Sequence, residues 1–426
     1  MELFTIDDLT SDYFQNVKLS DMFPENINYL QSYKIDKETE QKLSQEKLPE
    51  SKTTFKFSQN QKNNFLLINE DKIEITCIKI LHNIIAISAG NILKIYDNKL
   101  ITQNKNKDLS KISEESIYKV KNDDKIKTLA LNIFELENSQ NEDTIICALS
   151  GTFREIFIID ILNLNTINIL YGHRNDVFDL KFNPTNSNIL LSSSQDCSCR
   201  LWNIKNGNQI VLFGGPNSFH SSVYTIDFHN EGKMFVSGGV DNYIRIYVLN
   251  EKISKKIEES ENFKKENNNF KTLLKNLPDY ECNEIHRNYV DCVKFNGNFI
   301  LSKSVDGVIK EWLPTLNKEG NYFFLINTYI FHTNQLIVNI DFCFDEKNNL
   351  IFVGNELGNG FLFKLCEEEK SNTNDYYFYK NNPVDVCEIN NSLIRTCEFE
   401  PESNTIFFGS VEGKVYLYKI EEHLQN

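Results

Sequence analysis

The sequence predicts an all-β fold, a seven-bladed β-propeller, and three observations lead to that prediction. A short alternating apolar segment recurs along the 426 residues at intervals of roughly 50 residues, the spacing of propeller blades. Each segment is followed by two further short alternating runs, and period-two alternation is typical of β-strands. Asn, Asp and Gly occupy the breaks between these runs, where turns between antiparallel strands are expected.

The recurring segments share one frame, an alternating apolar pattern that closes on Phe or another apolar residue. They lie at residues 75–80, 126–131, 172–184, 221–232, 286–297, 337–342 and 394–399. Each has a variable position four residues before its closing apolar residue: Thr76, Lys127, Phe178, Tyr224, Asp291, Val338 and Arg395. In a propeller, these residues are expected at the top of the blades.

Two stretches lie outside the repeats. Residues 1–60 are rich in Glu, Lys, Asn and Gln, which predicts a mostly disordered tail before a propeller at 61–426. The longest interval between segments contains an insertion at 251–284, before the fifth blade. In this insertion the spacing of Ile253 and Ile257, among mixed charges, predicts a helix on the propeller rim followed by a polar loop.

The last blade has too few strands of its own. After Arg395 the chain supplies three strands and then ends, which would leave the outer edge of the blade open. Open edge strands are prone to pair with other chains. We therefore expect the spare strand at 64–69 to complete the last blade and close the ring.

Composition excludes several classes of function. The chain carries 45 Lys and Arg against 60 Asp and Glu, a net charge of −15, which disfavours direct binding of nucleic acid. No apolar run approaches the ~18–20 residues of a membrane-spanning helix, so no membrane association is expected. The ten cysteines include no C-x2-C pair, so the sequence predicts neither a metal site nor a cofactor.

One repeat contains a set of polar residues at the positions used by WD40 blades. His173 follows Gly172, and Ser193, Asp196 and Trp202 follow in the next two strands, so this repeat resembles a WD40 repeat. The resemblance implies a buried hydrogen-bond chain within the sheet. A hydrolase triad is the alternative for His, Ser and Asp, but the set recurs in register at another blade, so we expect no catalytic residue and no enzyme. The recurrence consists of His286, Asp306 and Trp312.

Three longer stretches resemble a narrower family. IHRNYVDC with LSKS shortly after it (285–314), LWNI and FGG within 171–215, and the insertion ending LPDYECN are similar to the extra-sex-combs (EED/ESC) family of Polycomb proteins. The resemblance implies a nuclear, non-catalytic scaffold of Polycomb repressive complex 2, which methylates lysine 27 of histone H3. It also implies that the lower face binds the SET-domain methyltransferase, alongside the other subunits. The alternative is a WD40 adaptor outside chromatin, such as a ubiquitin-ligase substrate receptor or a trafficking scaffold.

In that family the upper face binds a trimethyl-lysine peptide, such as a histone H3 tail, in an aromatic cage. The resemblance places the cage at four positions that are not aromatic in this chain, Thr76, Lys127, Val338 and Asn339. The arginine that accompanies the cage is matched by Arg395. Because a cage needs aromatic faces around the ammonium, we do not expect trimethyl-lysine to be bound in the family's manner.

Other residues of the predicted upper face are candidates for peptide binding. Phe178 and Tyr224 occupy adjacent blades, where they either contact a peptide side chain or pack against each other. Asp291, in the next blade, either pairs with a basic residue of a peptide or is simply solvated.

Overall fold

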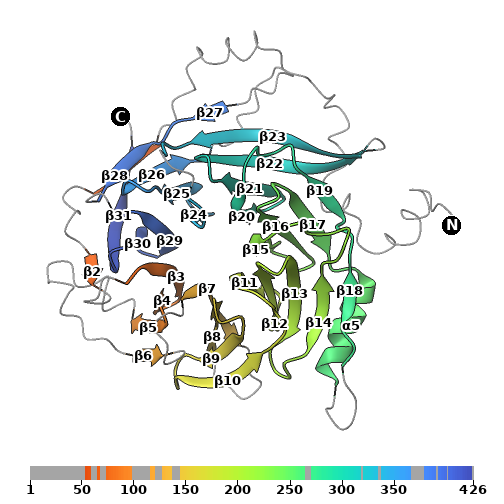
Figure 1. Cartoon of the computed structure of the whole chain (residues 1–426). Coiled ribbons are helices and arrows are strands. Elements are labelled where there is room, and N and C mark those ends of the chain that lie inside the picture. Colours follow the sequence, from red (N-terminus) through yellow and green to blue (C-terminus); the bar gives the residue numbers. More distant parts are fainter. Residues whose placement is uncertain are drawn as a thin grey trace.

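The described strands of the computed structural model form seven sheets arranged in a ring (Figure 1), which confirms the predicted propeller. The structure describes residues 53–58, 65–67, 73–97, 116–119, 127–136, 144–263, 270–317, 320–333, 337–365, 379–389, 392–400 and 402–424. Within this part of the chain, no helix is long and apolar enough to span a membrane.

The first four sheets follow one another along the chain. The first contains β3 (Ile75–Leu81), β4 (Ile84–Ala89), β5 (Ile92–Asp97) and β6 (Ser116–Lys119). The second contains β7 (Thr128–Leu136), β8 (Thr144–Gly151), β9 (Ile156–Asp160) and β10 (Asn165–Leu170). The third contains β11 (Val177–Asn183), β12 (Asn186–Ser194), β13 (Ser198–Asn203), β14 (Gln209–Phe213) and β18 (Leu273–Lys275). The fourth contains β15 (Val223–Phe228), β16 (Met234–Gly239), β17 (Ile244–Val248) and β19 (Tyr280–Cys282).

The last three sheets complete the ring. The fifth contains β20 (Val290–Asn296), β21 (Phe299–Ser304), β22 (Val308–Asn317), β23 (Gly320–Ile330) and β27 (Tyr379–Asn381). The sixth contains β24 (Phe342–Asp345), β25 (Leu350–Gly354), β26 (Asn359–Lys364) and β28 (Asp385–Glu388). The seventh contains β29 (Ile394–Glu400), β30 (Thr405–Ser410), β31 (Lys414–Leu424), β1 (Thr53–Phe57) and β2 (Phe65–Leu67).

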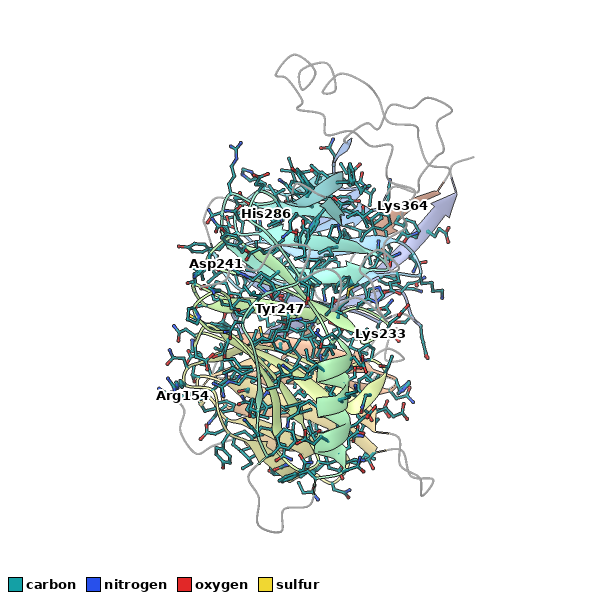
Figure 2. All side chains as sticks on the ribbon, turned by 90° about the vertical axis from the view of Figure 1, so that its right-hand side faces the viewer. Arg154, Lys233, Asp241, Tyr247, His286 and Lys364 are labelled. Atoms are coloured by element: carbon teal, nitrogen blue, oxygen red, sulfur yellow. The ribbon has the colours of Figure 1, made fainter. Side chains whose placement is uncertain are left out.

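The first strand of each sheet faces the axis of the ring (Figure 1). We call the end of the ring at which these inner strands begin the upper face, and the end at which they finish the lower face. Figure 2 shows the two faces on opposite sides of the ring, with Asp241 and His286 on the upper face and Lys233 and Lys364 on the lower face. Apolar side chains of neighbouring sheets pack into continuous clusters between them, which is how a propeller buries both faces of each sheet.

The predicted closure of the ring is confirmed, and it uses two strands. β2 pairs with the beginning of β31 and β1 pairs with its end, both antiparallel, on the edge that β30 leaves free. β2 lies within the predicted strand at 64–69. β1 lies inside the segment 1–60 predicted as a tail, so Thr53–Phe57 belongs to the seventh sheet; the earlier residues lie outside the described part of the chain.

The insertion at 251–284 covers the rim of the third and fourth sheets. The predicted helix is present as α5 (Glu251–Glu261); the side chain of Asn250 caps its first turn, and Ile253 is buried against the third sheet. The expectation of a polar loop after the helix is wrong at two places. β18 adds a parallel strand to β14, and β19 forms the outer strand of the fourth sheet, because both segments meet the unpaired edge of a strand.

A β-bulge near the start of six inner strands brings one residue out of the ladder at the upper face. The bulged residues are Thr76, Leu129, Phe178, Tyr224, Asp291 and Arg395. The repeat frame is therefore wrong in the second sheet, where Leu129 and not Lys127 takes the bulged position. Lys127 is exposed and precedes β7, and Val338 and Asn339 precede β24.

Candidate peptide interfaces

A buried chain of hydrogen bonds links the strands of the third sheet. The two imidazole nitrogens of His173 lie 2.9 Å from the Asp196 carboxylate (Nδ1) and 2.7 Å from the Ser192 hydroxyl (Nε2), and Trp202 Nε1 donates to the same hydroxyl at 2.9 Å. A neutral imidazole donates from one nitrogen and accepts at the other. Because the carboxylate only accepts, Nδ1 donates to Asp196 and the Ser192 hydroxyl donates to Nε2.

The serine of this chain is Ser192, whereas the sequence predicted Ser193. Successive residues of a strand point to opposite faces of the sheet, so a shift of one residue turns the side chain away from His173. The Ser193 hydroxyl is buried and has no hydrogen-bond partner among the residues that the structure describes. The sequence could not separate the two because Ser192, Ser193 and Ser194 are consecutive.

A second chain occurs in the fifth sheet, with one predicted member missing. His286 Nε2 lies 2.8 Å from the Ser302 hydroxyl, and Trp312 Nε1 donates to that hydroxyl at 3.0 Å. Asp306 is exposed, and among the residues that the structure describes it forms neither a hydrogen bond nor an ion pair with His286, so its predicted membership is wrong. Burial, together with the nearby cation of Lys310, lowers the pKa of His286 to about 3, so the ring is neutral at physiological pH.

The upper face carries an ion-pair cluster at the positions where the family resemblance places an aromatic cage. Arg395 Nε donates to Glu74 Oε1 at 2.6 Å, and its Nη1 donates to the carbonyl oxygens of Val338 and Asn339 at 2.7 and 3.2 Å. The ammonium of Lys127 lies 3.9 Å from Glu74 Oε2. The site therefore contains a carboxylate whose two oxygens already face cations, and no aromatic wall among these residues.

Thr76, the bulged residue of the first sheet and one of the predicted cage positions, already has a hydrogen-bond partner within its own sheet. Its hydroxyl lies 2.9 Å from the hydroxyl of Ser88 on the adjacent strand. It therefore contributes neither an aromatic face nor a free carboxylate to this part of the upper face.

Phe178 and Tyr224 pack against each other across the third and fourth sheets. Their ring centroids are 4.9 Å apart and their planes meet at 72°, an edge-to-face contact. Both side chains are half-buried, so the pair also presents a surface to solvent. Burial raises the pKa of Tyr224, and the electrostatic influence of Tyr289 and Asp291 adds to the rise.

Asp291 is not available to a peptide. Its side chain is fully buried, Lys303 Nζ donates to its carboxylate at 2.7 Å, and the backbone N–H of Ile340 lies 3.4 Å from its other oxygen. The expectation of a solvated or peptide-pairing carboxylate is wrong, because the lysine on the neighbouring strand reaches the bulged residue across the ladder.

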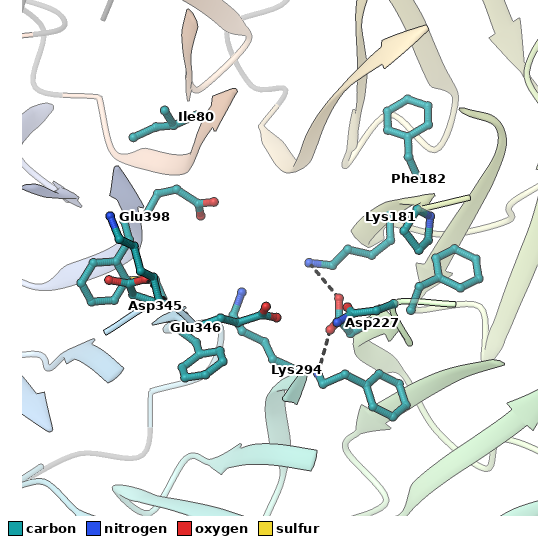
Figure 3. Close-up of a pocket in the computed structure, with 16 residues that line it drawn as sticks. Ile80, Lys181, Phe182, Asp227, Lys294, Asp345, Glu346 and Glu398 are labelled. Atoms are coloured by element: carbon teal, nitrogen blue, oxygen red, sulfur yellow. Dashed lines mark hydrogen bonds and ion pairs between the residues drawn. The ribbon is translucent and has the colours of Figure 1, made fainter. Parts of the chain in front are cut away.

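The lower face contains a pocket of about 570 Å³ around the axis of the ring (Figure 3). Phenylalanines from the ends of the inner strands form its apolar lining: Phe182, Phe228, Phe295, Phe344 and Phe399. Lys181, Lys294, Asp227 and Glu398 project toward its centre (Figure 3). Glu346 and Lys347, in the turn after β24, are exposed at its rim.

Charges within this pocket are largely balanced. Lys79 Nζ lies 2.7 Å from the Glu398 carboxylate, and Lys181 Nζ lies 3.9 Å from Asp227. Burial opposes the charge of Lys294, but Cys292 and the carboxylates of Glu398 and Asp227 raise its pKa. Four of the phenylalanines, Phe182, Phe228, Phe295 and Phe399, are buried between the sheets, so the pocket presents charged side chains of both signs beside the edges of these rings.

Sequence reasoning did not single out this pocket or Glu74. A signal for the pocket was present, because a charged residue stands directly before the closing apolar residue in most recurring segments, as in Lys79, Lys181, Asp227, Lys294 and Glu398. Only the ring closure brings these residues together. Within the described residues, no group of three His, Cys, Asp or Glu side chains could hold a metal ion.

The fold and the two buried hydrogen-bond chains define a WD40-repeat β-propeller. The family model "WD domain, G-beta repeat" matches residues 164–203 and 215–247, which cover most of the third and fourth sheets.

Among curated proteins, this chain is similar to Polycomb group proteins. It is 39% identical to Polycomb protein esc of Drosophila virilis over 170 residues, 39% of this chain and 40% of that protein. It is 30% identical to Polycomb group protein FIE1 of Oryza sativa subsp. japonica over 278 residues, 62% of this chain and 56% of that protein. The matched region thus spans less than two thirds of either relative. These similarities confirm the resemblance to the extra-sex-combs family.

Solved structures support the same architecture. A chain of Polycomb Repressive Complex 2 from Chaetomium thermophilum is similar with a TM-score of 0.67, 13% identity, and coverage of 84% of this chain and 98% of that chain. The apo complex in an autoinhibited state matches with a TM-score of 0.65 and 12% identity, covering 84% and 97%. At this level of identity the likeness establishes the fold alone.

Proposed function

We propose that this protein is a non-catalytic WD40 scaffold subunit of a Polycomb repressive complex 2-like methyltransferase of histone H3 lysine 27. In this function it binds and stabilises the SET-domain catalytic subunit and works in the nucleus. The relatives support the proposal, since they are Polycomb group proteins, and the propeller chains with the same fold come from Polycomb Repressive Complex 2.

The observation that carries the proposal is the lower-face pocket. It lies at the end of the ring axis and carries both signs of charge. Lys294, Glu398 and the exposed rim residues Glu346 and Lys347 can therefore pair with the polar side of a helix that lies across it. A rigid ring offers this surface without reorganising, so the partner segment alone is ordered on binding. Stabilisation of the catalytic subunit follows from that ordering.

The absence of a catalytic role is supported by how the candidate triad is used. The Ser192 hydroxyl is buried and shared between His173 and Trp202, so it is not exposed to a substrate. A nucleophile must be reachable by the atom that it attacks. His173 and His286 therefore both have structural hydrogen-bond partners.

Binding of trimethyl-lysine at the family's cage position is not part of the proposed function. Glu74 would have to release Arg395 and Lys127 before it faced a peptide cation, and no aromatic ring at Thr76, Lys127, Val338 or Asn339 would replace the cage. A methylated ammonium would thus find a competing cation where aromatic faces are needed.

The test is recovery of the catalytic subunit with the purified protein. Affinity purification from nuclei followed by mass spectrometry should recover a SET-domain methyltransferase. The double substitution Glu346→Lys and Lys347→Glu should reduce that recovery at least fivefold, because it inverts the charges at the rim of the lower-face pocket. Lys252→Glu is the matched control, since Lys252 is exposed on α5 at the outer rim, far from the pocket.

Two outcomes would reject the proposal. Recovery of ubiquitin-ligase or vesicle-coat subunits, without a methyltransferase, would support an adaptor outside chromatin. Equal recovery of the methyltransferase by the rim variant and by the α5 control would mean that the lower-face pocket is not its binding site.

A further inference from the structure

All the arginines of the chain lie at the upper face of the ring. The sequence contains six arginines among 45 basic residues, so lysine is its usual cation. Each arginine lies before or at the start of an inner strand, in the turn between the second and third strands of a sheet, or within the first three residues of a third strand. All these positions are at the upper end of a sheet, as Figure 2 shows for Arg154. The arginines are Arg154, Arg174, Arg200, Arg245, Arg287 and Arg395.

Three of these arginines have a charged partner within the fold and three do not. The ion pairs are Arg200 with Asp196, Arg245 with Asp241 and Arg395 with Glu74. Arg154, Arg174 and Arg287 are exposed, and within the described part of the chain their guanidinium groups form neither a hydrogen bond nor an ion pair. A guanidinium donates from a planar fork of N–H groups that matches the oxygens of a phosphate or a carboxylate. The three free arginines are therefore candidates for binding an anionic group of another molecule.

Arg154 has a backbone conformation that arginine rarely adopts. Its φ of 65° lies in the left-handed region, in the turn between β8 and β9. The corresponding turn has a left-handed glycine in four other sheets: Gly90, Gly307, Gly358 and Gly413. A residue with a Cβ is strained in this conformation, and such strain is concentrated at functional sites. Because the guanidinium of Arg154 has no polar partner among the described residues to offset the strain, we expect this side chain to be used in binding.

Arg154 lines a hollow of about 170 Å³ between its own turn and the segment that leads from β10 to β11. The other lining residues, which with Arg154 define what we call the upper-face hollow, are Phe153, Glu155, Tyr171, Gly172 and His173. Tyr171 is 68% exposed, and its hydroxyl has no hydrogen-bond partner in the described ranges. A Cβ on Gly172 would lie 2.5 Å from Arg200 Nη1, so the glycine allows the backbone of the lining to pass close to this guanidinium.

Arg174 stands beside the upper-face hollow. It follows the lining residue His173, and its backbone N–H donates at 3.0 Å to Asp196 Oδ2, the oxygen that also binds the imidazole of His173. Burial lowers the pKa of Arg200, Asp196 opposes that shift, and the positive charge of Arg174 adds to it. Arg154 and Arg174 therefore approach the hollow from two segments of the chain, and they outnumber Glu155, the one carboxylate of its lining.

We propose that the upper-face hollow binds the phosphate of a phosphorylated serine or threonine in a partner peptide. A phosphate carries a charge of about −2 and three acceptor oxygens, so it can engage both Arg154 and Arg174. A carboxylate has a single charge and two oxygens, so it gains less from two cations. The Tyr171 hydroxyl supplies a further donor. This inference goes beyond the proposed function, because it assigns a second partner to the face opposite the lower-face pocket.

The test is binding of a fluorescein-labelled peptide, Ala-Ala-phosphoserine-Ala-Ala, to the purified full chain, measured by fluorescence anisotropy. This peptide should bind roughly tenfold more tightly than the same peptide with serine or glutamate at the central position. Arg154→Gly should remove most of that preference while keeping the fold, because glycine adopts the left-handed turn without strain. Arg174→Ala should also weaken the preference. Arg287→Ala is the matched control, since Arg287 is a free arginine of the same face but precedes β20 in the fifth sheet.

Three outcomes would overturn this inference. The first is equal binding of the three peptides. The second is an equal loss in Arg287→Ala and Arg154→Gly, which would report the charge of the whole face instead of the hollow. The third is competition by inorganic phosphate as strong as by unlabelled phosphopeptide, which would make a free anion the ligand. Arg154→Gly should still recover the methyltransferase as the parent protein does, because the lower face is unchanged, so this inference and the proposed function can fail separately.

Discussion

Two adjacent serines offer a sharp test of the buried hydrogen-bond chain. Ser192 and Ser193 are both fully buried, but within the described part of the chain only the Ser192 hydroxyl has partners, at 2.7 Å from His173 Nε2 and 2.9 Å from Trp202 Nε1. Ser192→Ala would leave an indole N–H and an imidazole nitrogen buried without partners, at a cost of about 1–3 kcal/mol each. We expect Ser192→Ala to lower the free energy of unfolding by about 2–4 kcal/mol.

The same substitution at the next residue should have almost no effect. Ser193→Ala removes a hydroxyl that makes no hydrogen bond, so the change in free energy of unfolding should stay within about 0.5 kcal/mol. Urea denaturation followed by tryptophan fluorescence measures the free energy of unfolding of both variants, because Trp202 and Trp312 are each buried in one of the two hydrogen-bond chains. A larger loss in Ser193→Ala than in Ser192→Ala would refute the assignment of the chain.

Three further predictions follow from buried groups. The pKa of His286 is lowered to about 3, so between that value and about 6.5 the unfolded chain binds more protons than the folded chain. The free energy of unfolding is therefore highest above this window and decreases as the pH is lowered, by about 2 kcal/mol at pH 5. His286→Gln should not show this loss when denaturation is compared at pH 7 and pH 5. Lys303→Met leaves Asp291 buried without its cation and should cost about 3–5 kcal/mol, much of it regained when Asp291→Asn is added; equal stability of parent and single variant would contradict this. Phe55→Ala should lower the free energy of unfolding by about 3 kcal/mol because Phe55 is buried in the closing strand, whereas exposed Lys56→Ala should not; a harmless Phe55→Ala would mean that β1 does not close the ring.

Local patterns in the sequence were sufficient for the architecture. Alternation of apolar residues with turn residues between the runs is a property of each segment alone, and it predicted the inner strands and the need for a closing strand. The position predicted for the bulge was wrong in the second sheet because the apolar pattern of residues 126–131, IKTLAL, is compatible with either of the two strand registers. The bulge that selects Leu129 instead of Lys127 depends on how β7 pairs with β8, which the segment does not encode.

Predictions for individual polar residues failed where a partner from a neighbouring strand decided the outcome. Asp291 is at a top-face position in the repeat, but Lys303 on β21 reaches it and buries it. Asp306 follows the spacing of Asp196, yet it is exposed while Asp196 meets His173. Spacing along the chain does not report which of two carboxylates lies within reach of an imidazole.

The sequence by itself determined the class of protein, because period-two strands repeated at a blade-like interval can bury their faces only by stacking side by side around a ring. Its acidic composition and the lack of a C-x2-C pair predicted neither a nucleic-acid ligand nor a metal site. Only the tertiary structure decided which surfaces can bind. The lower-face pocket, the Glu74 ion pairs and the contact between Phe178 and Tyr224 each combine residues from different sheets, so their geometry exists only after ring closure has brought those sheets together.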